Sequence, residues 1–366
     1  MEKLNTQVLK QVNELPTPTW NHLEINGIDI EVPVIADAEA AEAELAAEAE
    51  GRFAGAACKP PVGGAGQEAQ AWLEAAAGEV CRVEVAPGET AGEPIVVDMA
   101  QVARAAFALD VVVGAGAQAS VVLVGDAPAS EELGSTSGWS VRIAVEEGAK
   151  LDLFSVVACG APQMLDNVGI VAQANAAVTV KQYVLDAGLS ATGFRCDLAG
   201  DGSTLELDAR YLGRGAQTLD LGHVVRQLGK HTLCTMTFSG VLADDAFKSL
   251  RDTIDLVRGC KGSKGSENET VLLAGDGVGN QSLPVILCDE DDVAGDHGAT
   301  VGEISPEQRA YLVSRGLAPE DIPALVMEST FAAAFQDAPV PQATACVRAA
   351  AERVLGADVV ADMLAE

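Results

Sequence analysis

The amino-acid sequence predicts a mainly β fold, with a β-helix or β-solenoid at its centre and helices toward both ends. Three observations predict it. First, 366 residues of which 48% are hydrophobic are enough for a large buried core. Second, aromatic residues make up only 4% of the chain while glycines number 37, so the core has to be built from small aliphatic residues in thin layers. Third, short turn-then-strand segments recur at a nearly constant interval between about residues 80 and 290.

The repeat is the strongest of these observations. The first core-type aliphatic residues of six such segments are Ile95, Val121, Leu151, Val178, Leu205 and Leu233. Successive members lie 26, 30, 27, 27 and 28 residues apart. A unit made of short strands does not bury its own apolar face, so successive units have to stack, and this interval suits one coil of a solenoid. We therefore predict a β-helix or β-solenoid core over residues 79–303.

The N-terminal region, residues 1–78, is expected to be partly helical and partly extended. Its first residues are interpreted as a short helix that leads into an extended, Pro-containing stretch. Asp37–Glu50 consists of strong helix formers with almost no apolar stripe, which predicts a solvated surface helix. The Gly/Pro-rich run 59–66 breaks the chain, and Gln67–Ala77 is a second helix candidate.

The C-terminal region, residues 304–366, is expected to form a helical domain because the strand signals stop before it. Ser305 is suited to an N-cap and Pro306 to the first helical position. The helix that they start should run to Arg315, with Gly316 directly beyond its end. Further helices are predicted over 319–335 and within 343–364.

The charge of the chain excludes nucleic acid as its main partner. Lys and Arg number 23 against 54 Asp and Glu, a formal net charge of −31, whereas nucleic-acid binding relies on cationic side chains that displace counterions.

No apolar run approaches the roughly 18 residues that span a bilayer, and the N-terminal stretch is too polar for a secretory signal, so we expect a cytoplasmic protein. Eight dispersed cysteines without a C-x-x-C pair favour reduced thiols over disulfides or a closed zinc site.

The most informative motif is Asp296–Gly302 (DHGATVG), and Tyr311–Gly316 (YLVSRG) begins nine residues after its end. Near pH 7 a histidine offers a neutral nitrogen lone pair, and Gly298 beside His297 adds no side-chain bulk, so a ligand can approach the imidazole closely. His297 is therefore the first candidate for a metal contact. The histidines at 223 and 231 lie among the repeats and are interpreted as core or strand-end residues.

These two segments resemble the C-terminal signature of the SufB/SufD family, the scaffold subunits of the SUF iron-sulfur cluster assembly system. Within that family the chain looks more like SufD, because Gly298 stands where SufB has Glu. The resemblance implies a right-handed parallel β-helix between helical terminal regions. It also implies a non-catalytic scaffold that pairs with a SufB-type subunit through the β-helix and binds a SufC-type ATPase through its C-terminal helices.

Carried over residue by residue, the resemblance implies that His297 contacts a nascent iron-sulfur cluster at the interface with the partner subunit. It also implies that Tyr311, Leu312 and Arg315 contact the ATPase. One imidazole does not hold a cluster, so the other ligands are expected from another chain or from sulfide. The position of an essential SufB cysteine aligns with Val278, so this chain looks unable to build a cluster alone.

Several alternatives stay open at this stage. Cys260 and Cys288, the thiols nearest the motif, are interpreted as buried structural cysteines, with cluster ligation as the alternative. The run Asp289–Asp292 (DEDD) suits either a divalent cation or a solvated acidic turn. The glycines at 275–279 and 259–265 match neither a dinucleotide fingerprint nor a Walker A loop, so no nucleotide is expected to bind. The alternative functions are a self-pairing, SufB-like homodimeric scaffold and a β-helix polysaccharide lyase.

Overall fold

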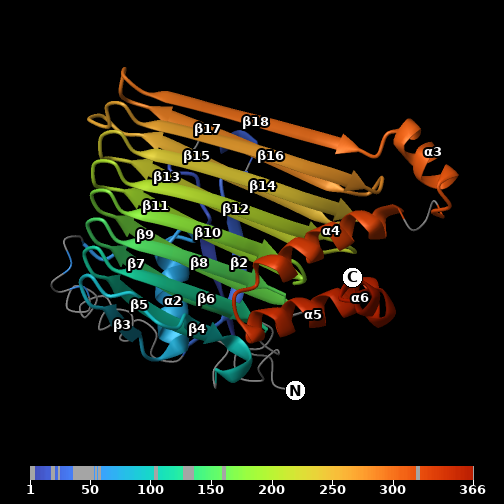
Figure 1. The fold of residues 1–366 in the computed structure, drawn as a ribbon, viewed down its shortest axis with the longest axis horizontal. Helices are drawn as coiled ribbons and strands as arrows, with labels where there is room; N and C mark the ends of the chain where they lie inside the picture. Colours follow the sequence, from blue (N-terminus) through green and yellow to red (C-terminus); the bar gives the residue numbers. More distant parts are fainter. Residues whose placement is uncertain are drawn as a thin grey trace.

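The computed structural model shows a parallel β-solenoid with helices at its side and at one end (Figure 1). It describes residues 5–17, 21–23, 25–35, 53, 56, 59–102, 106–126, 136–158, 162–318 and 322–365. Consecutive strands of the solenoid alternate between two eight-stranded sheets, so each coil adds one strand to each sheet. All strand pairs within these two sheets are parallel.

The two sheets have the same construction. The first, in chain order, consists of β3 (Cys81–Val85), β5 (Ala106–Val113), β7 (Thr136–Val145), β9 (Gln163–Ala172), β11 (Leu189–Leu198), β13 (Thr218–Gln227), β15 (Phe247–Leu256) and β17 (Gly279–Cys288). The second consists of β4 (Ile95–Asp98), β6 (Gln118–Gly125), β8 (Lys150–Val157), β10 (Ala177–Val184), β12 (Thr204–Gly213), β14 (Leu233–Ala243), β16 (Lys264–Ala274) and β18 (Ala294–Glu303). The last strands, β17 and β18, form the end of the solenoid at the top of Figure 1.

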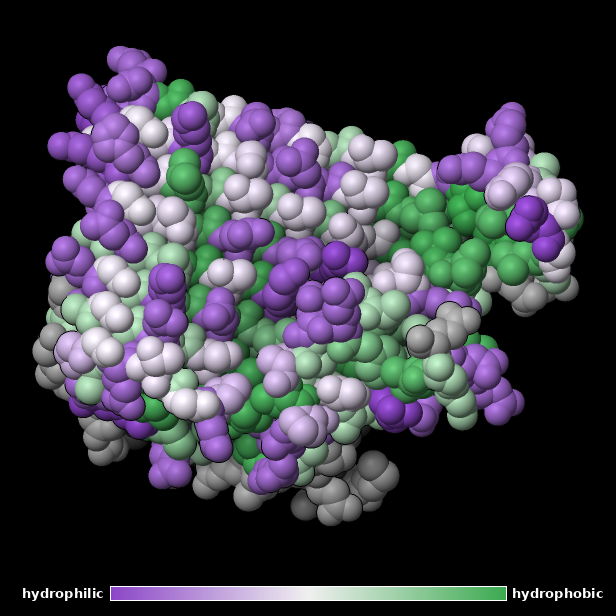
Figure 2. Space-filling view, in the orientation of Figure 1, coloured by the Kyte–Doolittle hydropathy of each residue, from purple (hydrophilic) through white to green (hydrophobic). Residues whose placement is uncertain are grey.

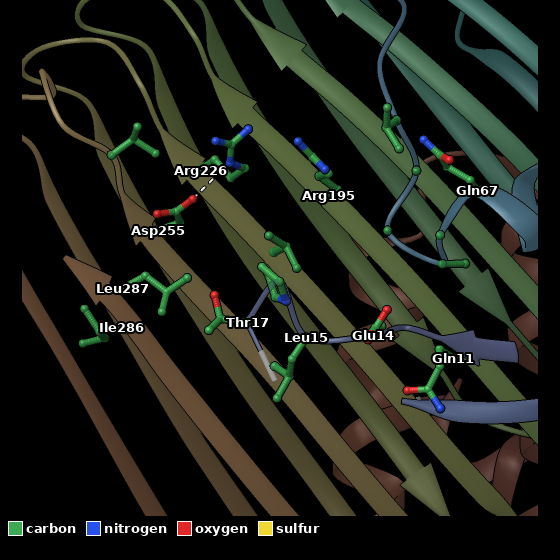
Figure 3. A pocket seen from close by; sticks show the side chains of 18 of the residues that line it. Gln11, Glu14, Leu15, Thr17, Gln67, Arg195, Arg226, Asp255, Ile286 and Leu287 are labelled. Atoms are coloured by element: carbon green, nitrogen blue, oxygen red, sulfur yellow. Dashed lines mark hydrogen bonds and ion pairs between the residues drawn. The ribbon is translucent and has the colours of Figure 1, made fainter. Parts of the chain in front are cut away.

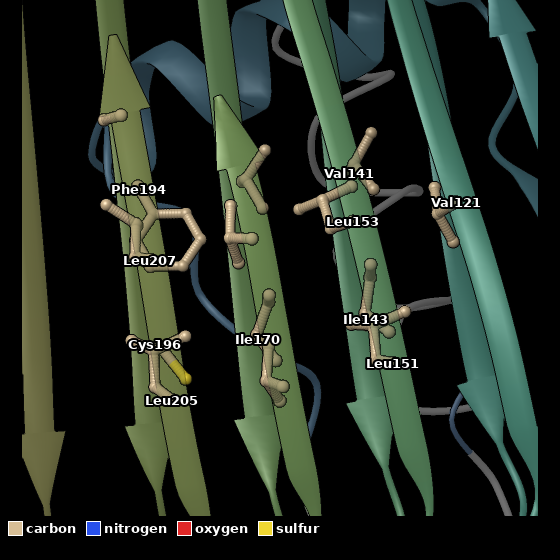
Figure 4. Packing of buried hydrophobic residues seen from close by; sticks show 14 of the residues in the cluster. Val121, Val141, Ile143, Leu151, Leu153, Ile170, Phe194, Cys196, Leu205 and Leu207 are labelled. Carbon is tan, nitrogen blue, oxygen red and sulfur yellow. The ribbon is translucent and has the colours of Figure 1, made fainter. Parts of the chain in front are cut away.

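The solenoid is held together by columns of aliphatic side chains between the sheets. Alternate residues of a strand point to the same side, and in-register parallel pairing places each of them on its counterpart one coil away. Figure 4 shows such stacking, with Leu151 and Leu153 from one sheet lying near Ile143 and Val141 from the other. Each of these four side chains is at most 3% exposed. Stacked coils therefore bury apolar side chains that a single coil would leave exposed to solvent.

The predicted repeat is confirmed as a solenoid, with two shifts in the residues chosen to mark it. Leu151, Val178 and Leu205 occupy one column as expected. Val121 pairs with Leu153 instead of Leu151, because the connection between these coils is longer. Leu205 pairs with Cys234, while Leu233 points outward and is 48% exposed. The residue of β14 that faces the core is therefore Cys234 and not the predicted Leu233. A shift of one residue along a strand exchanges its inward and outward faces.

The start of the chain differs from the predicted short helix. Residues of β1 (Thr6–Val12) pair in antiparallel fashion with β2 (Ile28–Pro33), with a short 3-10 helix, η1 (Asn21–Leu23), between them. The predicted helix over 67–77 is confirmed as α2 (Gln67–Ala77), and its Trp72 donates to the carbonyl of Pro33 at 2.9 Å. Because apolar residues of β1 and β2 are buried against this helix, the start of the chain forms a strand pair and not the predicted short helix. The predicted helix Asp37–Glu50 lies outside the described residues.

The C-terminal helices follow the predicted order. α3 (Pro306–Ser314) begins with a capping box, in which Ser305 accepts from the backbone of Gln308. It is followed by α4 (Ile322–Asp337), α5 (Pro341–Leu355) and α6 (Ala357–Met363), while the predicted start at 319–321 lies outside the described residues. A second short 3-10 helix, η2 (Met99–Gln101), follows β4. No helix among the described residues is long and apolar enough to cross a membrane.

The last three helices pack on the outer face of the sheet that contains β6, β8 and β10. Phe331 and Val347 are fully buried there with Tyr183 of the sheet. The hydroxyl of Tyr183 donates to Asp337 at 2.6 Å, and Arg353 donates to Asp186 at 2.8 Å. These helices are therefore attached to the solenoid, whereas α3 extends beyond the end of β18 and buries no residue (Figure 1).

Candidate functional site

His297 lies on β18, the last strand of the solenoid, and its side chain is exposed. It pairs in register with Glu267 of β16, so the two side chains point to the same side of the sheet. Glu267 is buried, which places this side toward the space between the two sheets. His297 therefore occupies an inward-facing position, and it is exposed because no further coil of the described chain covers it. Its role as a metal contact stays a prediction.

The column below His297 changes from apolar to charged. In the successive coils it contains Val180, Leu207, Met236 and then Glu267. Glu267 is only 2% exposed, although a carboxyl group in an apolar interior is unfavourable without polar partners. In this column the coils below carry apolar residues, and the first charged residue lies directly beneath the imidazole.

Lys248 is the cation of this polar interior. Its ammonium group donates to Glu269 at 2.5 Å and to Ser282 of the last coil at 3.0 Å. Tyr211 donates to the same carboxylate at 2.7 Å, and the lysine lies 5.6 Å from the centre of the Tyr211 ring. Burial lowers the pKa of Lys248, and the nearby Glu269 opposes that shift. The ion pair is closed off from solvent, since Lys248 is fully buried and Glu269 nearly so.

Asp252 and Glu267 form a carboxyl pair beside this ion pair. Burial raises the pKa of Asp252 to about 7, and the charge of Glu269 adds to the shift. Burial likewise raises the pKa of Glu267 to about 8, with a further contribution from the charge of Asp252. A protonated Glu267 donates to Asp252, so the pair holds one proton near neutral pH.

Sequence reasoning missed this group although its signal was present. Lys248 and Asp252 stand on the same face of one strand, and Glu267 and Glu269 on the same face of another. The preceding coil carries Leu219, His223, Met236 and Phe238 at these positions. Charged residues on the inward-facing alternation mark a polar interior. That signal is readable only once it is known which face of each strand points inward.

The two nearby thiols differ from each other. Cys260 is buried as expected, and burial raises the pKa of its thiol. Cys288 is exposed, contrary to the prediction, because it ends the uncovered strand β17, and its thiol donates to the carbonyl of Glu290 at 3.3 Å. Two other cysteines, at 58 and 159, lie outside the described residues.

Cys288 is not positioned to join His297 at one metal ion. A methyl group built on Gly295 would meet Ile286 at 3.2 Å, so these two residues face each other across the last coil. Cys288 and His297 each lie two residues further along strands that run in opposite directions, which separates them by about 13 Å along the strand axis. Among the described residues, no group of three or more His, Cys, Asp or Glu side chains could hold a metal ion.

The residues expected to contact an ATPase lie together on α3. Tyr311 is 61% exposed, Leu312 is half-buried and Arg315 is exposed at the C-terminal end of the helix. Val301 of β18 and Leu325 of α4 are also exposed, by 50% and 41%. Figure 2 shows an apolar area in green around this projecting part of the molecule. The expected contact residues are thus accessible, and their role stays a prediction.

A further groove of the described surface lies elsewhere. It has a volume of about 1240 Å³ and runs over the outer face of β11, β13, β15 and β17, beside the N-terminal strand pair. Figure 3 shows that Arg195 and Arg226 face this groove with Asp255, to which Arg226 donates at 3.0 Å.

The two histidines that were expected at core or strand-end positions lie in earlier coils than His297. His223 is buried with its pKa lowered to about 3 by burial, and His231 lies in a turn.

Comparison with known proteins places these features in a family context. The family described as "SUF system FeS cluster assembly, SufBD core domain" matches residues 98–330. The iron-sulfur cluster assembly protein SufD of Bacillus subtilis (strain 168) is 28% identical over 144 residues, which cover 39% of this chain and 33% of that protein. An iron-sulfur cluster assembly SufBD family protein of Mycobacterium leprae is 31% identical over 121 residues, or 33% of this chain and 14% of that protein. The matched segments thus cover a third or less of these relatives.

Proposed function

This chain belongs to the SufBD core family of the SUF iron-sulfur cluster assembly system, and we propose that within that system it acts as a non-catalytic scaffold subunit. The observation that carries this proposal is the uncovered last coil. It presents His297 together with two ten-residue strands whose outer edges have no partner among the described residues. Unpaired strand edges are suited to association with another chain.

The partner at this end is a SufB-type subunit that contributes the cluster ligands that this chain lacks. The nascent iron-sulfur cluster is cargo, held transiently at the interface, and His297 supplies one nitrogen donor to it. Imidazole replaces thiolate on the iron of some clusters, so a single histidine is a chemically suitable ligand. The cluster would sit above the polar interior formed by Glu267 and Lys248.

Replacing His297 tests this role. His297→Ala should reduce the iron and sulfide content of the anaerobically reconstituted complex by about 10-fold or more, because even outer partners of a metal ligand are worth about 10- to 100-fold in affinity. The matched control is Thr300→Ala, an exposed residue on the same strand. Both variants should fold and bind the partner subunits equally well. Equal iron and sulfide in His297→Ala and wild type would remove His297 from the cluster site.

The SufC-type ATPase binds α3 and the start of α4. This proposal is supported by the exposure of Tyr311 and Arg315, and by the absence of buried residues in α3 among the described contacts. An exposed amphipathic aromatic residue beside an arginine is typical of the residues that dominate interface energies.

A Tyr311→Ala variant should bind the ATPase about 10- to 100-fold more weakly by calorimetry, as expected for the loss of a central interface aromatic. The fold should be unaffected because Ala favours helix at least as well as Tyr. Arg348→Ala, at an exposed position of α5, serves as the control and should bind normally. Normal affinity of Tyr311→Ala for the ATPase would show that the contact lies elsewhere.

A further inference from the structure

The uncovered end of the solenoid carries a strongly one-sided charge. Residues 279–303, which form the last coil, contain no Lys or Arg. Their carboxylates, here called the acidic rim, are Asp289, Glu290, Asp291, Asp292, Asp296 and Glu303. All are exposed except Glu290, which is half-buried. The rim borders the two strands that we propose as the pairing surface. Its negative charge therefore acts on any partner that approaches these strands.

The chain itself compensates this charge only in part. Glu290 accepts from the backbone of Gly259 at 2.9 Å, and this bond, with the nearby charge of Lys261, lowers the pKa of its carboxyl. The turn one coil below also carries Arg258 and Lys261, and Lys264 begins β16 directly after it. Among the ion pairs formed between described residues, however, none involves a carboxylate of the rim. The rim therefore faces outward with most of its charge available.

Two identical ends of this kind repel each other. A homodimer about a two-fold axis would place the same surface patch of each copy at the interface. Each copy would bring its acidic rim, and a formal net charge of −31 that opposes approach at longer range. Like charges across an interface disfavour the wrong partner, most strongly at low salt where screening is weak.

We infer that the acidic rim selects its partner by charge: the occupant of the uncovered end is a second solenoid subunit with a basic facing surface, and a second copy of this chain is disfavoured. The inference rests on the pairing proposed above and adds the chemistry of the partner to it. The sequence of the DEDD run suits either a cation site or a solvated turn. In this inference the run acts as an electrostatic steering element. Attraction of this kind raises association rates more than it lowers dissociation rates.

The test is the salt dependence of association with the SufB-type subunit of the same system, measured by stopped flow. The wild-type association rate constant should fall at least about 10-fold between 20 and 500 mM NaCl, since steering is screened by salt. Asp291→Lys/Asp292→Lys should lower the rate constant about 10-fold at low salt and leave little salt dependence. Asp152→Lys/Glu206→Lys changes the net charge equally, but on exposed positions of β8 and β12, and should associate nearly as fast as wild type.

Two results would overturn the inference while leaving the proposed function intact. One is binding of the rim variant to the SufB-type subunit at the wild-type rate. The other is a stable wild-type homodimer at 20 mM NaCl in sedimentation velocity, with the rim variant no more prone to dimerise. If neither wild type nor any variant bound the SufB-type subunit at any salt concentration, the proposed pairing itself would fail, and the inference with it.

Discussion

Lys248→Met is expected to lower the free energy of unfolding by about 3–5 kcal/mol, because it leaves the buried Glu269 without its cation. Lys248 is fully buried and its ammonium group bridges the carboxylate of Glu269 and the hydroxyl of Ser282. Removing one member of a buried ion pair leaves a charge in a medium that solvates it poorly. Urea denaturation at pH 7 measures the loss. Lys150→Met, an exposed lysine at the start of β8, is the matched control and should change stability by less than about 0.5 kcal/mol.

A double variant separates the ion pair from simple packing. In Lys248→Met/Glu269→Gln the amide oxygen still accepts from Tyr211, but no uncompensated charge is left. Replacing both members of a buried pair is much less destabilising than removing one, so the double variant should be more stable than Lys248→Met alone. If the two changes instead destabilised additively, the lysine would stabilise the last coils through its aliphatic stem and not through its charge.

Glu267→Gln should stabilise the protein in alkaline solution, by about 2 kcal/mol at pH 9. In the folded protein the pKa of Glu267 is raised to about 8 and that of Asp252 to about 7. Both lie above the ordinary values of 4.5 and 3.8, so protons are bound more tightly in the folded state. The contribution of this pair to the free energy of unfolding is therefore fully present below about pH 4 and is lost as the pH rises through 7 to 8. A glutamine keeps a donor for Asp252 and removes the second charge.

Unfolding free energies at pH 5, 7 and 9 test this prediction. Wild type and Glu267→Gln should differ little at pH 5 and diverge toward pH 9. Glu206→Gln, which neutralises an exposed carboxylate on β12, should follow the wild-type curve. A wild-type curve parallel to that of Glu267→Gln over this range would mean that the pair does not retain a proton in the folded state.

The elements that could be predicted from the sequence are those specified by neighbouring residues. The start of α3 depends on Ser305, Pro306 and Gln308, which lie within one turn, and its capping box is present as expected from them. The solenoid itself follows from a repeat of aliphatic residues, which is a property of the sequence at a fixed period. The family signature around His297 is likewise local.

The elements that were missed depend on distant partners. β1 has a weak alternation of its own, and it is a strand because β2 and the buried Trp72 of α2 lie against it. Leu233 and Cys234 are both suited to the core, and only the pairing with Leu205 decides which of them points inward. The exposure of Cys288 similarly depends on the solenoid ending one strand later.

The sequence by itself determined the coil length, the family and the candidate imidazole, because periodicity, turns and short motifs act between residues that are close along the chain. Only the tertiary structure decided what surrounds that imidazole. Thirty residues of coil place Glu267 one strand away from His297. Because β17 and β18 are the last strands of the described solenoid, the histidine and the acidic rim stay uncovered. Stacking of coils converts long sequence separations into contacts about 5 Å apart, and no local pattern specifies where that stacking stops.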